Sequence, residues 1–140
     1  YAQVGNDQVR VPWLDEGLAE HSTSTYYRDV FGEDRANTLV TQRWLVPYQA
    51  AVENGYDAVV NQPAAAFGRQ YEVIVYGKGA LFFESLRERL GDDLFRAVLR
   101  EYADQYRWRI ATPDAFLRVA ESVTGQDLDD LYNRWILSKR

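Results

Sequence analysis

Apolar side chains recur three and four residues apart along most of this sequence, a spacing that places them on one face of an α-helix. Towards the C-terminus this spacing is carried by Phe116, Val119, Ala120 and Val123, and then by Leu128, Leu131, Tyr132 and Trp135. Glycines and prolines separate the segments, as is typical of helix ends. The pattern predicts an all-α fold with helices at about 12–31, 33–53, 80–90, 92–106, 113–124 and 127–137.

Two places interrupt the helical pattern. Pro47 lies inside the second predicted helix, where a proline is expected to kink or break it. Residues from about 54 to 76 predict a long loop, a kind of segment that is often functional in a compact domain. Within it, 71–76 is expected to be extended or turn-like, and Gly77-Lys78-Gly79 is expected to be a tight turn. Residues 106–111 alternate and predict a short extended link.

Composition narrows the class of protein. The 140 residues are enough for one domain or part of one, and the apolar fraction of 46% is typical of a globular chain. The absence of cysteine excludes disulfides and thiolate metal sites, and the absence of methionine indicates a processed or excised chain. A net charge of −5, with arginines scattered among acidic residues, argues against nucleic-acid binding and a polybasic membrane patch. No apolar run approaches the roughly 18 residues of a transmembrane helix.

Glu16 is the first candidate for chemistry, because it lies near the start of a predicted helix, just after Pro12 and Trp13. It also has an ordinary explanation, since the helix dipole favours an anion at this end. Glu20 adds a second carboxylate to the same face, and a nearby cation would relieve their repulsion. His21 lies about 140° around the helix from Glu16 and cannot share a metal ion with it. We therefore interpret this single histidine as a surface or packing residue.

Tyr76 is the second candidate, because a neutral, rigid phenol is a good hydrogen-bond donor to a developing oxyanion. With ten tyrosines in the chain, an ordinary structural role is the simpler explanation for any one of them. The glycines on both sides of Lys78 weaken that explanation, since they permit a close backbone approach beside Tyr76. A phosphate-binding loop is excluded here, because Gly79 follows the lysine where that motif requires Ser or Thr.

Residues 12–20, Pro-Trp-Leu-Asp-Glu-Gly-Leu-Ala-Glu, resemble the W-L-N-E-G-x-A-E signature of zinc aminopeptidases of the gluzincin type. The resemblance implies that Glu16 is the third zinc ligand, after two histidines of an H-E-x-x-H helix. It also places Glu20 where thermolysin-like relatives hold a second carboxylate against a metal-binding histidine. Asp15 departs from the asparagine that is commonest in the family.

A second stretch resembles the same family, because residues 71–80 match its Y-x-x-x-x-Y-x-K-G-A pattern. The resemblance implies that Tyr76 stabilises the tetrahedral intermediate and that Tyr71 lies near the substrate. The two motifs occur in the family's order, and familiar segments continue to Trp135, so the resemblance spans almost the whole chain. It implies the multi-helix C-terminal half of a thermolysin-like metallopeptidase catalytic domain.

The family spacing would place the second histidine of H-E-x-x-H upstream of Tyr1, together with the general-base glutamate. We therefore expect residues 1–140 to be a single fragment of a zinc-dependent aminopeptidase, inactive and without zinc by itself. Its expected partners are a peptide substrate and the missing N-terminal half of the domain. An exposed apolar face, covered by self-association, is expected as well. Composition alone leaves one alternative, a non-catalytic helical protein-interaction module whose aromatic helices form a groove.

Overall fold

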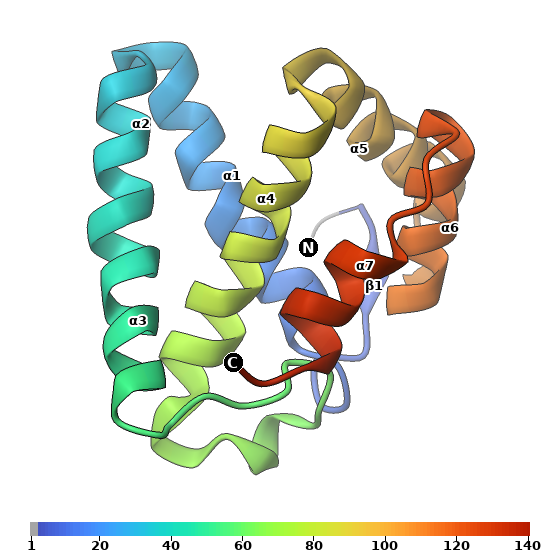
Figure 1. Ribbon diagram of the computed structural model, residues 1–140. Helices are drawn as coiled ribbons and strands as arrows, with labels where there is room; N and C mark the ends of the chain where they lie inside the picture. Colours follow the sequence, from blue (N-terminus) through green and yellow to red (C-terminus); the bar gives the residue numbers. More distant parts are fainter. Residues whose placement is uncertain (1–2) are drawn as a thin grey trace.

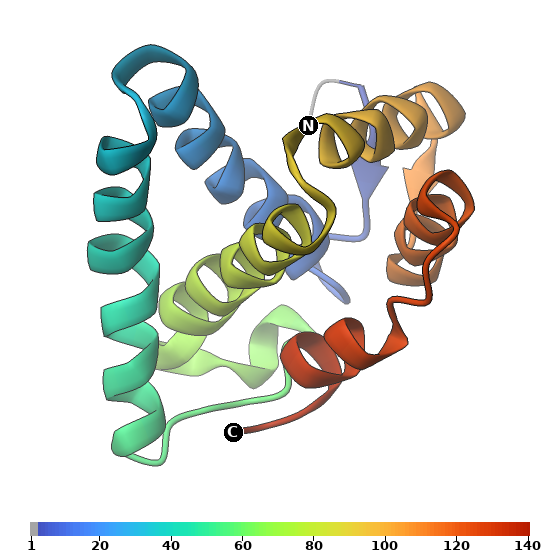
Figure 2. The ribbon, with the colours of Figure 1, turned by 45° about the horizontal axis from the view of Figure 1, so that its top comes forward.

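The computed structural model describes residues 3–140 and shows an almost entirely helical molecule, which confirms the predicted all-α class (Figure 1). Two central helices pack on one another, α1 (Trp13–Phe31) and α4 (Gly79–Leu90). One side is formed by a helical column of α2 (Glu33–Leu39), the π-helix η1 (Val40–Leu45) and α3 (Val46–Glu53). On the other side lie α5 (Asp92–Tyr106) and α6 (Pro113–Thr124) (Figure 2). Finally, α4 is covered by α7 (Asp129–Tyr132) and the π-helix η5 (Asn133–Leu137).

An aromatic core fills the space between α1, α4, α6 and α7. The Trp13 ring lies edge-on to Phe82 with centroids 5.6 Å apart, and Phe83 packs edge-on against Phe116 at 5.4 Å. Tyr132 packs against Phe82 at 6.0 Å, and all five rings are buried. Such pairs contribute about 0.5–1.5 kcal/mol each beyond the burial of area. In the described part of the chain, these aromatic residues form the core and do not line an open groove.

Pro47 neither breaks nor sharply kinks its helix, contrary to the expectation from sequence. The column from α2 to α3 stays continuous in two views (Figures 1 and 2). Pro47 is the second residue of α3, directly after the wider π-helical turn of η1. A proline clashes with the carbonyl four residues earlier and leaves it without its N–H partner. A π-helical turn changes the hydrogen-bond register before that position, so the chain accommodates the ring without ending the helix.

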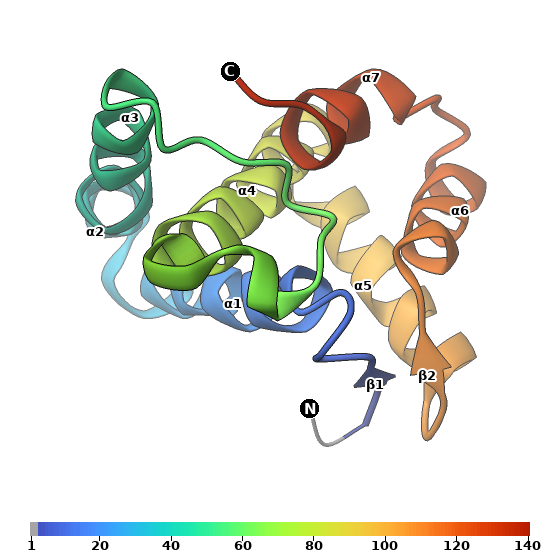
Figure 3. The same ribbon diagram turned by 90° about the horizontal axis from the view of Figure 1, so that it is seen from below.

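The loop predicted at 54–76 is shorter than expected, and its last part is helical. Two 3₁₀ turns, η2 (Ala64–Ala66) and η3 (Gly68–Gln70), lead into the π-helix η4 (Glu72–Lys78), which continues into α4 (Figure 3). The extended or turn-like interpretation of 71–76 and the turn at 77–79 are therefore wrong. Ile74 and Val75 favour strands by propensity, yet both are fully buried in this helical turn. Tertiary burial has overridden the local preference.

A short parallel ladder joins the segment before α1 to the segment between α5 and α6. β1 (Gly5–Asn6) pairs with β2 (Ile110–Ala111), as Figure 3 shows, so 106–111 contains the expected extended link. Trp108 leads into β2 with a φ of 62°, which is unusual for a bulky residue, and its N–H donates to the Gln3 carbonyl at 2.6 Å. Within residues 3–140, no helix is long and apolar enough to cross a membrane.

Several large apolar side chains are exposed, and some of them fall into two groups. Tyr26, Val30 and Phe31 are each more than half exposed at the end of α1, and Trp108 and Ile110 are 77% and 71% exposed beside β2. Exposed apolar groups that gather on a surface are typical of regions that another chain covers. Association with a second copy or with further parts of the domain stays a prediction.

A buried ionic network ties α1 to α4, and it decides the role of the single histidine. The Glu84 carboxylate lies 2.8 Å from His21 Nε2 and accepts bonds from Arg28 at 3.0 Å and Arg87 at 2.8 Å. His21 is 1% exposed, so it is a packing residue and not a surface one. Burial lowers the pKa of His21, and because Glu84 only accepts, the neutral ring carries its proton on Nε2.

The same network lowers the pKa of Glu84. Burial alone would raise its pKa, but the hydrogen bonds from His21 and Arg87 outweigh that effect and lower it to about 2. A carboxyl with a depressed pKa contributes stability above its unfolded pKa, and this stability is lost as the pH falls towards the folded value. His21 acts in the same direction, since the unfolded chain binds a proton more readily than the folded one. Acid therefore weakens this fold.

We predict that Glu84→Gln lowers the free energy of unfolding of this chain at pH 7 by about 3–5 kcal/mol, because it removes the buried counter-charge of Arg28 and Arg87. The carboxylates that remain beside the two arginines, Glu33 and Asp92, are exposed. Between pH 6 and pH 3, the wild-type chain should lose more stability than the variant does. Urea unfolding followed by circular dichroism measures both effects. Glu88→Gln, an exposed position on the same helix, is the matched control and should stay within about 0.5 kcal/mol of wild type. Equal losses in the two variants would contradict the prediction.

Candidate active site

The position of Glu16 is fixed by the buried start of α1. Trp13, the first residue of α1, is fully buried, and its indole N–H donates to Asn61 Oδ1 at 3.3 Å. Glu16 follows in the first turn with a half-buried side chain. Its carboxylate therefore lies on a short stretch of helix that is anchored by the core, where the helix dipole stabilises its charge.

Tyr76 lies on the π-helix η4, which packs against α1. Tyr71 immediately precedes η4, and its ring stands edge-on to the Tyr76 ring with centroids 5.7 Å apart. Short π-helical segments are rare and occur frequently at functional sites. The two tyrosines of the second motif are thus brought together on the surface that faces α1.

The structure brings Glu16 and Tyr76 together. Burial raises the pKa of Tyr76, and the charge of Glu16 and a side-chain hydrogen bond between the two residues raise it further. Burial and the charge of Glu16 also raise the pKa of Tyr71. A phenol beside a carboxylate keeps its proton at neutral pH, so Tyr76 is a hydrogen-bond donor. Both candidate residues and Tyr71 therefore share one surface.

Glu20 lies one turn after Glu16, and two side chains of η1 donate hydrogen bonds to its carboxylate. Trp44 Nε1 donates to Glu20 Oε1 at 2.9 Å, and Arg43 donates to both carboxylate oxygens, with Nη2 at 3.2 Å from Oε2. Burial would raise the pKa of Glu20, but the bonds from Arg43 and Trp44 outweigh it and lower the pKa. Sequence reasoning missed Arg43 and Trp44, because nothing in their spacing links them to Glu20.

A cavity of about 550 Å³ opens beside Tyr76. It is bounded by α1, η1, the start of α3, η3 and η4, and its charged lining comes from Glu20, Arg43, Arg69 and Glu72. The volume lies within the usual range for sites that bind small molecules. Charges of both signs line it, so the cavity offers hydrogen-bond donors and acceptors next to the phenol.

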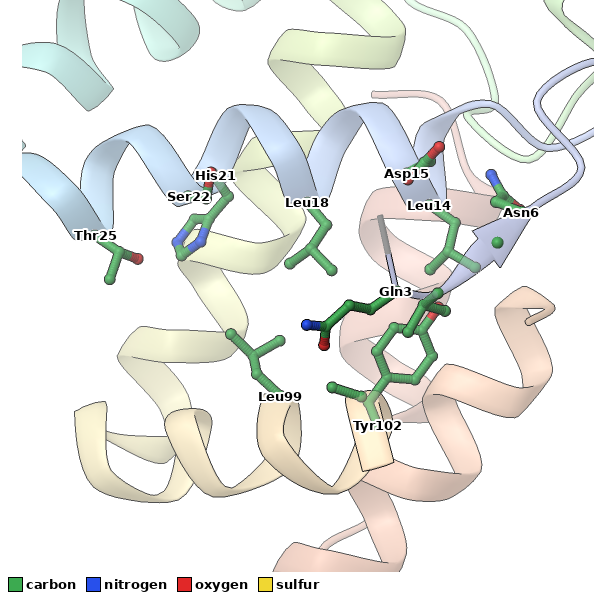
Figure 4. Close-up of a pocket in the computed structure, with 13 residues that line it drawn as sticks. Gln3, Asn6, Leu14, Asp15, Leu18, His21, Ser22, Thr25, Leu99 and Tyr102 are labelled. Carbon is green, nitrogen blue, oxygen red and sulfur yellow. The ribbon is translucent and has the colours of Figure 1, made fainter. Parts of the chain in front are cut away.

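A second cavity, of about 400 Å³, lies on a different face of α1 and contains neither Glu16 nor Tyr76. In Figure 4 the Gln3 side chain points into it, between Leu18 of α1 and Leu99 of α5. Tyr102 and Leu14 complete an apolar wall. Its lining carries no group placed for the chemistry predicted from the sequence.

Glu16 suits one position in a zinc site. A zinc ion takes carboxylate oxygen readily, but a stable site needs three or four protein ligands, usually with histidines. Among residues 3–140, three possible ligands approach one another only at Glu121, Asp127 and Asp129, at the end of α6 and beyond it. Within residues 3–140, no set of three possible ligands forms at the surface shared by Glu16 and Tyr76, so a metal ion held there would need ligands from elsewhere.

The sequence profile described as "Peptidase family M1 domain" matches residues 3–135. The chain belongs to peptidase family M1. This confirms the resemblance carried by residues 12–20 and 71–80.

Two curated aminopeptidases are similar in sequence to this M1 chain. Aminopeptidase N of Lactobacillus helveticus is 30% identical over 77 residues, which is 55% of this chain and 9% of the relative. Probable aminopeptidase 2 of Sulfurisphaera tokodaii is 25% identical over 128 residues, which is 89% of this chain and 16% of the relative. This M1 chain thus spans less than a fifth of the length of either relative.

Solved M1 peptidases share the fold. A mutant of the M1 zinc metallopeptidase of Deinococcus radiodurans superposes with a TM-score of 0.71 at 18% identity, covering 91% of this chain and 28% of that one. A mutant two-domain M1 zinc metallopeptidase bound to L-tryptophan gives a TM-score of 0.73 at 20% identity, with coverages of 93% and 28%. The helical arrangement of this M1 chain is therefore that of part of an M1 zinc metallopeptidase.

One backbone contact sets the separation of the two helices that carry the M1 motifs. A Cβ atom placed on Gly17 would lie 2.9 Å from the carbonyl carbon of Gly79, closer than real Cβ contacts come. Gly17 follows Glu16 directly, and Gly79 lies three residues after Tyr76. The two glycines allow α1 and the start of α4 to touch backbone to backbone, so the glycine pair governs how near Glu16 stands to Tyr76.

We predict that Gly17→Ala lowers the free energy of unfolding by about 1–3 kcal/mol, because the added methyl forces the two helices apart. Alanine is otherwise the better helix former, so a net loss reports the contact itself. Gly77→Ala is the matched control, since a Cβ there meets only the Glu72 carbonyl at 3.9 Å. Urea unfolding should show the control unchanged or more stable by up to about 1 kcal/mol. A stabilised Gly17→Ala chain would disprove the contact.

Proposed function

We propose that this chain is the part of a zinc aminopeptidase that supplies one metal ligand, Glu16, and the oxyanion-stabilising Tyr76. The observation that carries the proposal is the pairing of these two side chains, which come from motifs about sixty residues apart. Membership of family M1 and the two aminopeptidase relatives support the same function. A helical interaction module gives no reason for a carboxylate and a phenol from two separate motifs to pair.

Glu16 is proposed to hold the zinc ion through a carboxylate oxygen, with the remaining protein ligands coming from outside residues 3–140. When bound, zinc polarises the scissile carbonyl and acidifies a water molecule towards neutral pH. The anchored start of α1 fixes the direction of the Glu16 side chain. Glu20, already bonded to Arg43 and Trp44, keeps acceptor capacity for a further bond. That bond is the one predicted to a metal-binding histidine.

Tyr76 is proposed to donate its phenolic proton in a hydrogen bond to the oxygen on which negative charge develops. Its raised pKa keeps the proton on the phenol at neutral pH, so the donor is present when the charge forms. The Tyr71 ring, edge-on to Tyr76, restricts the rotation of that phenol and lies near the substrate. The water's proton would be taken by a base outside this chain.

The proposed substrate is a peptide whose N-terminal residue is removed. The cavity beside Tyr76 gives room for part of such a peptide next to the phenol. A mutant M1 zinc metallopeptidase from Deinococcus radiodurans, similar in fold, was crystallised bound to a Tyr-Ser-Ala substrate. A tripeptide is accordingly a suitable first substrate for the full-length protein that contains this chain.

In that full-length protein, we predict that Tyr76→Phe lowers kcat by about 10²–10³-fold, or roughly 2.7–4 kcal/mol of transition-state stabilisation. Zinc content should stay unchanged, because the phenol is not a ligand. Glu16→Gln should instead lose both zinc and activity, as measured by metal analysis and by release of the N-terminal amino acid. Full turnover in Tyr76→Phe, or full zinc content in Glu16→Gln, would remove the assigned role from that residue.

For the 140-residue chain alone, we predict no aminopeptidase activity and no tight zinc site, because one carboxylate cannot compete with water for the ion. Isothermal titration with zinc should give the same weak heats for the wild-type chain and for its Glu16→Gln variant. Nanomolar binding that disappears in the variant would contradict the prediction.

A further inference from the structure

Lys78 is fully buried, which is unusual for a lysine. It is the last residue of η4 and lies two residues after Tyr76. An ammonium group inside a protein is costly unless its charge is paired and its protons are hydrogen-bonded. The contacts of Lys78 therefore show how its buried charge is compensated.

All three protons of the ammonium have acceptors. Lys78 Nζ donates to Asp57 Oδ1 at 2.8 Å, to the Ala58 carbonyl at 2.9 Å and to the Ser138 carbonyl at 2.8 Å. A lysine has three donors and no acceptor, so its bonding capacity is completely used. One side chain thus joins η4 to the segment after α3 and to the residues after η5.

The Asp57 carboxylate is also buried and hydrogen-bonded on both oxygens. Its side chain is 4% exposed and accepts from the Tyr48 hydroxyl at 3.1 Å and from the Arg140 backbone N–H at 2.5 Å. The Arg140 guanidinium in turn lies 4.1 Å from the centroid of the Trp135 ring. The Lys78–Asp57 pair is therefore embedded in a rigid polar hub with fixed directions.

This hub lies behind the helical turn that carries Tyr76. Side chains two residues apart on a helix point to widely separated directions. Tyr76 is half-buried and meets Glu16, whereas Lys78 is buried and meets Asp57. The turn is thus held against α1 by the Gly17–Gly79 contact and against Asp57 by the ammonium.

We propose that Lys78 is a positioning residue for Tyr76: its buried, triply bonded ammonium fixes the rotation of the π-helical turn that points the phenol at Glu16. The inference rests on the function proposed above for Tyr76. An apolar side chain could fill the same volume, but apolar packing tolerates small rotations. Three directional hydrogen bonds from one atom admit a single orientation of the turn.

The test uses the full-length enzyme and the variant Lys78→Met, which keeps the length of the side chain and removes its charge and donors. Steady-state hydrolysis of an aminoacyl chromogenic substrate gives kcat and KM separately, and metal analysis gives the zinc content. We expect kcat to fall by about 10- to 100-fold, since a displacement on the order of 1 Å at a catalytic group has effects of this size. KM and zinc content should be unchanged.

The deciding measurement is the double variant Tyr76→Phe/Lys78→Met. If Lys78 acts through the phenol, removing the phenol leaves it nothing to position, and the double variant should match Tyr76→Phe within about twofold. A purely structural role predicts that the two losses multiply. Multiplying losses, or an undiminished kcat in folded Lys78→Met, would overturn the inference.

Two further variants keep the test decisive. Asp57→Asn weakens the same hub and is used if Lys78→Met does not fold; it should lower kcat and show the same lack of multiplication with Tyr76→Phe. Arg89→Met removes a partly exposed cation that pairs with Asp130, outside both buried networks, and should leave kcat unchanged. An unchanged kcat in Tyr76→Phe would overturn both the proposed function and this inference. A lowered kcat in Tyr76→Phe, with an unchanged kcat in Lys78→Met and Asp57→Asn, would overturn this inference alone.

Discussion

Gly17 of α1 and Gly79 of α4 meet without any side chain between them, and the rest of the site is built around this contact. Glu16 stands next to the first glycine, and Tyr76 lies just before the second. Both are on helices, so any separation or rotation of α1 against α4 moves the carboxylate relative to the phenol. Two small residues thus set the distance between Glu16, the proposed metal ligand, and Tyr76, the proposed oxyanion donor.

Buried charge holds this crossing in place at two points along the chain that forms α4. Lys78, just before α4, is bonded to Asp57, and Glu84, in its middle, is bonded to His21 and Arg87. Buried ionic groups add little net stability compared with apolar residues of the same size. Their hydrogen bonds are directional, however, and they select one arrangement of the helices. The aromatic core supplies the stability, and the ionic hubs supply the orientation.

The spacing of apolar residues and the residues at helix ends predicted the helices that keep regular α-helical hydrogen bonding. The helices 92–106 and 113–124 lie where the apolar spacing and the glycines at their ends placed them. The same reasoning failed for 71–79, where β-branched and glycine residues form a buried π-helix. The predicted break at Pro47 was also wrong, because the wider π-helical turn of η1 before it accommodates the proline ring. In both cases the hydrogen-bond register of the helix changed, and no residue periodicity encodes that change.

The sequence by itself determined the helical class, membership of family M1 through two motifs, and the choice of Glu16 and Tyr76 as the residues to examine. Only the tertiary structure decided that these two side chains share a surface, that Arg43 and Trp44 bind Glu20, and that the Lys78 ammonium is buried with Asp57. The reason is physical: spacing along a helix fixes which side chains share a face. Which faces then meet depends on how helices distant in the sequence pack together.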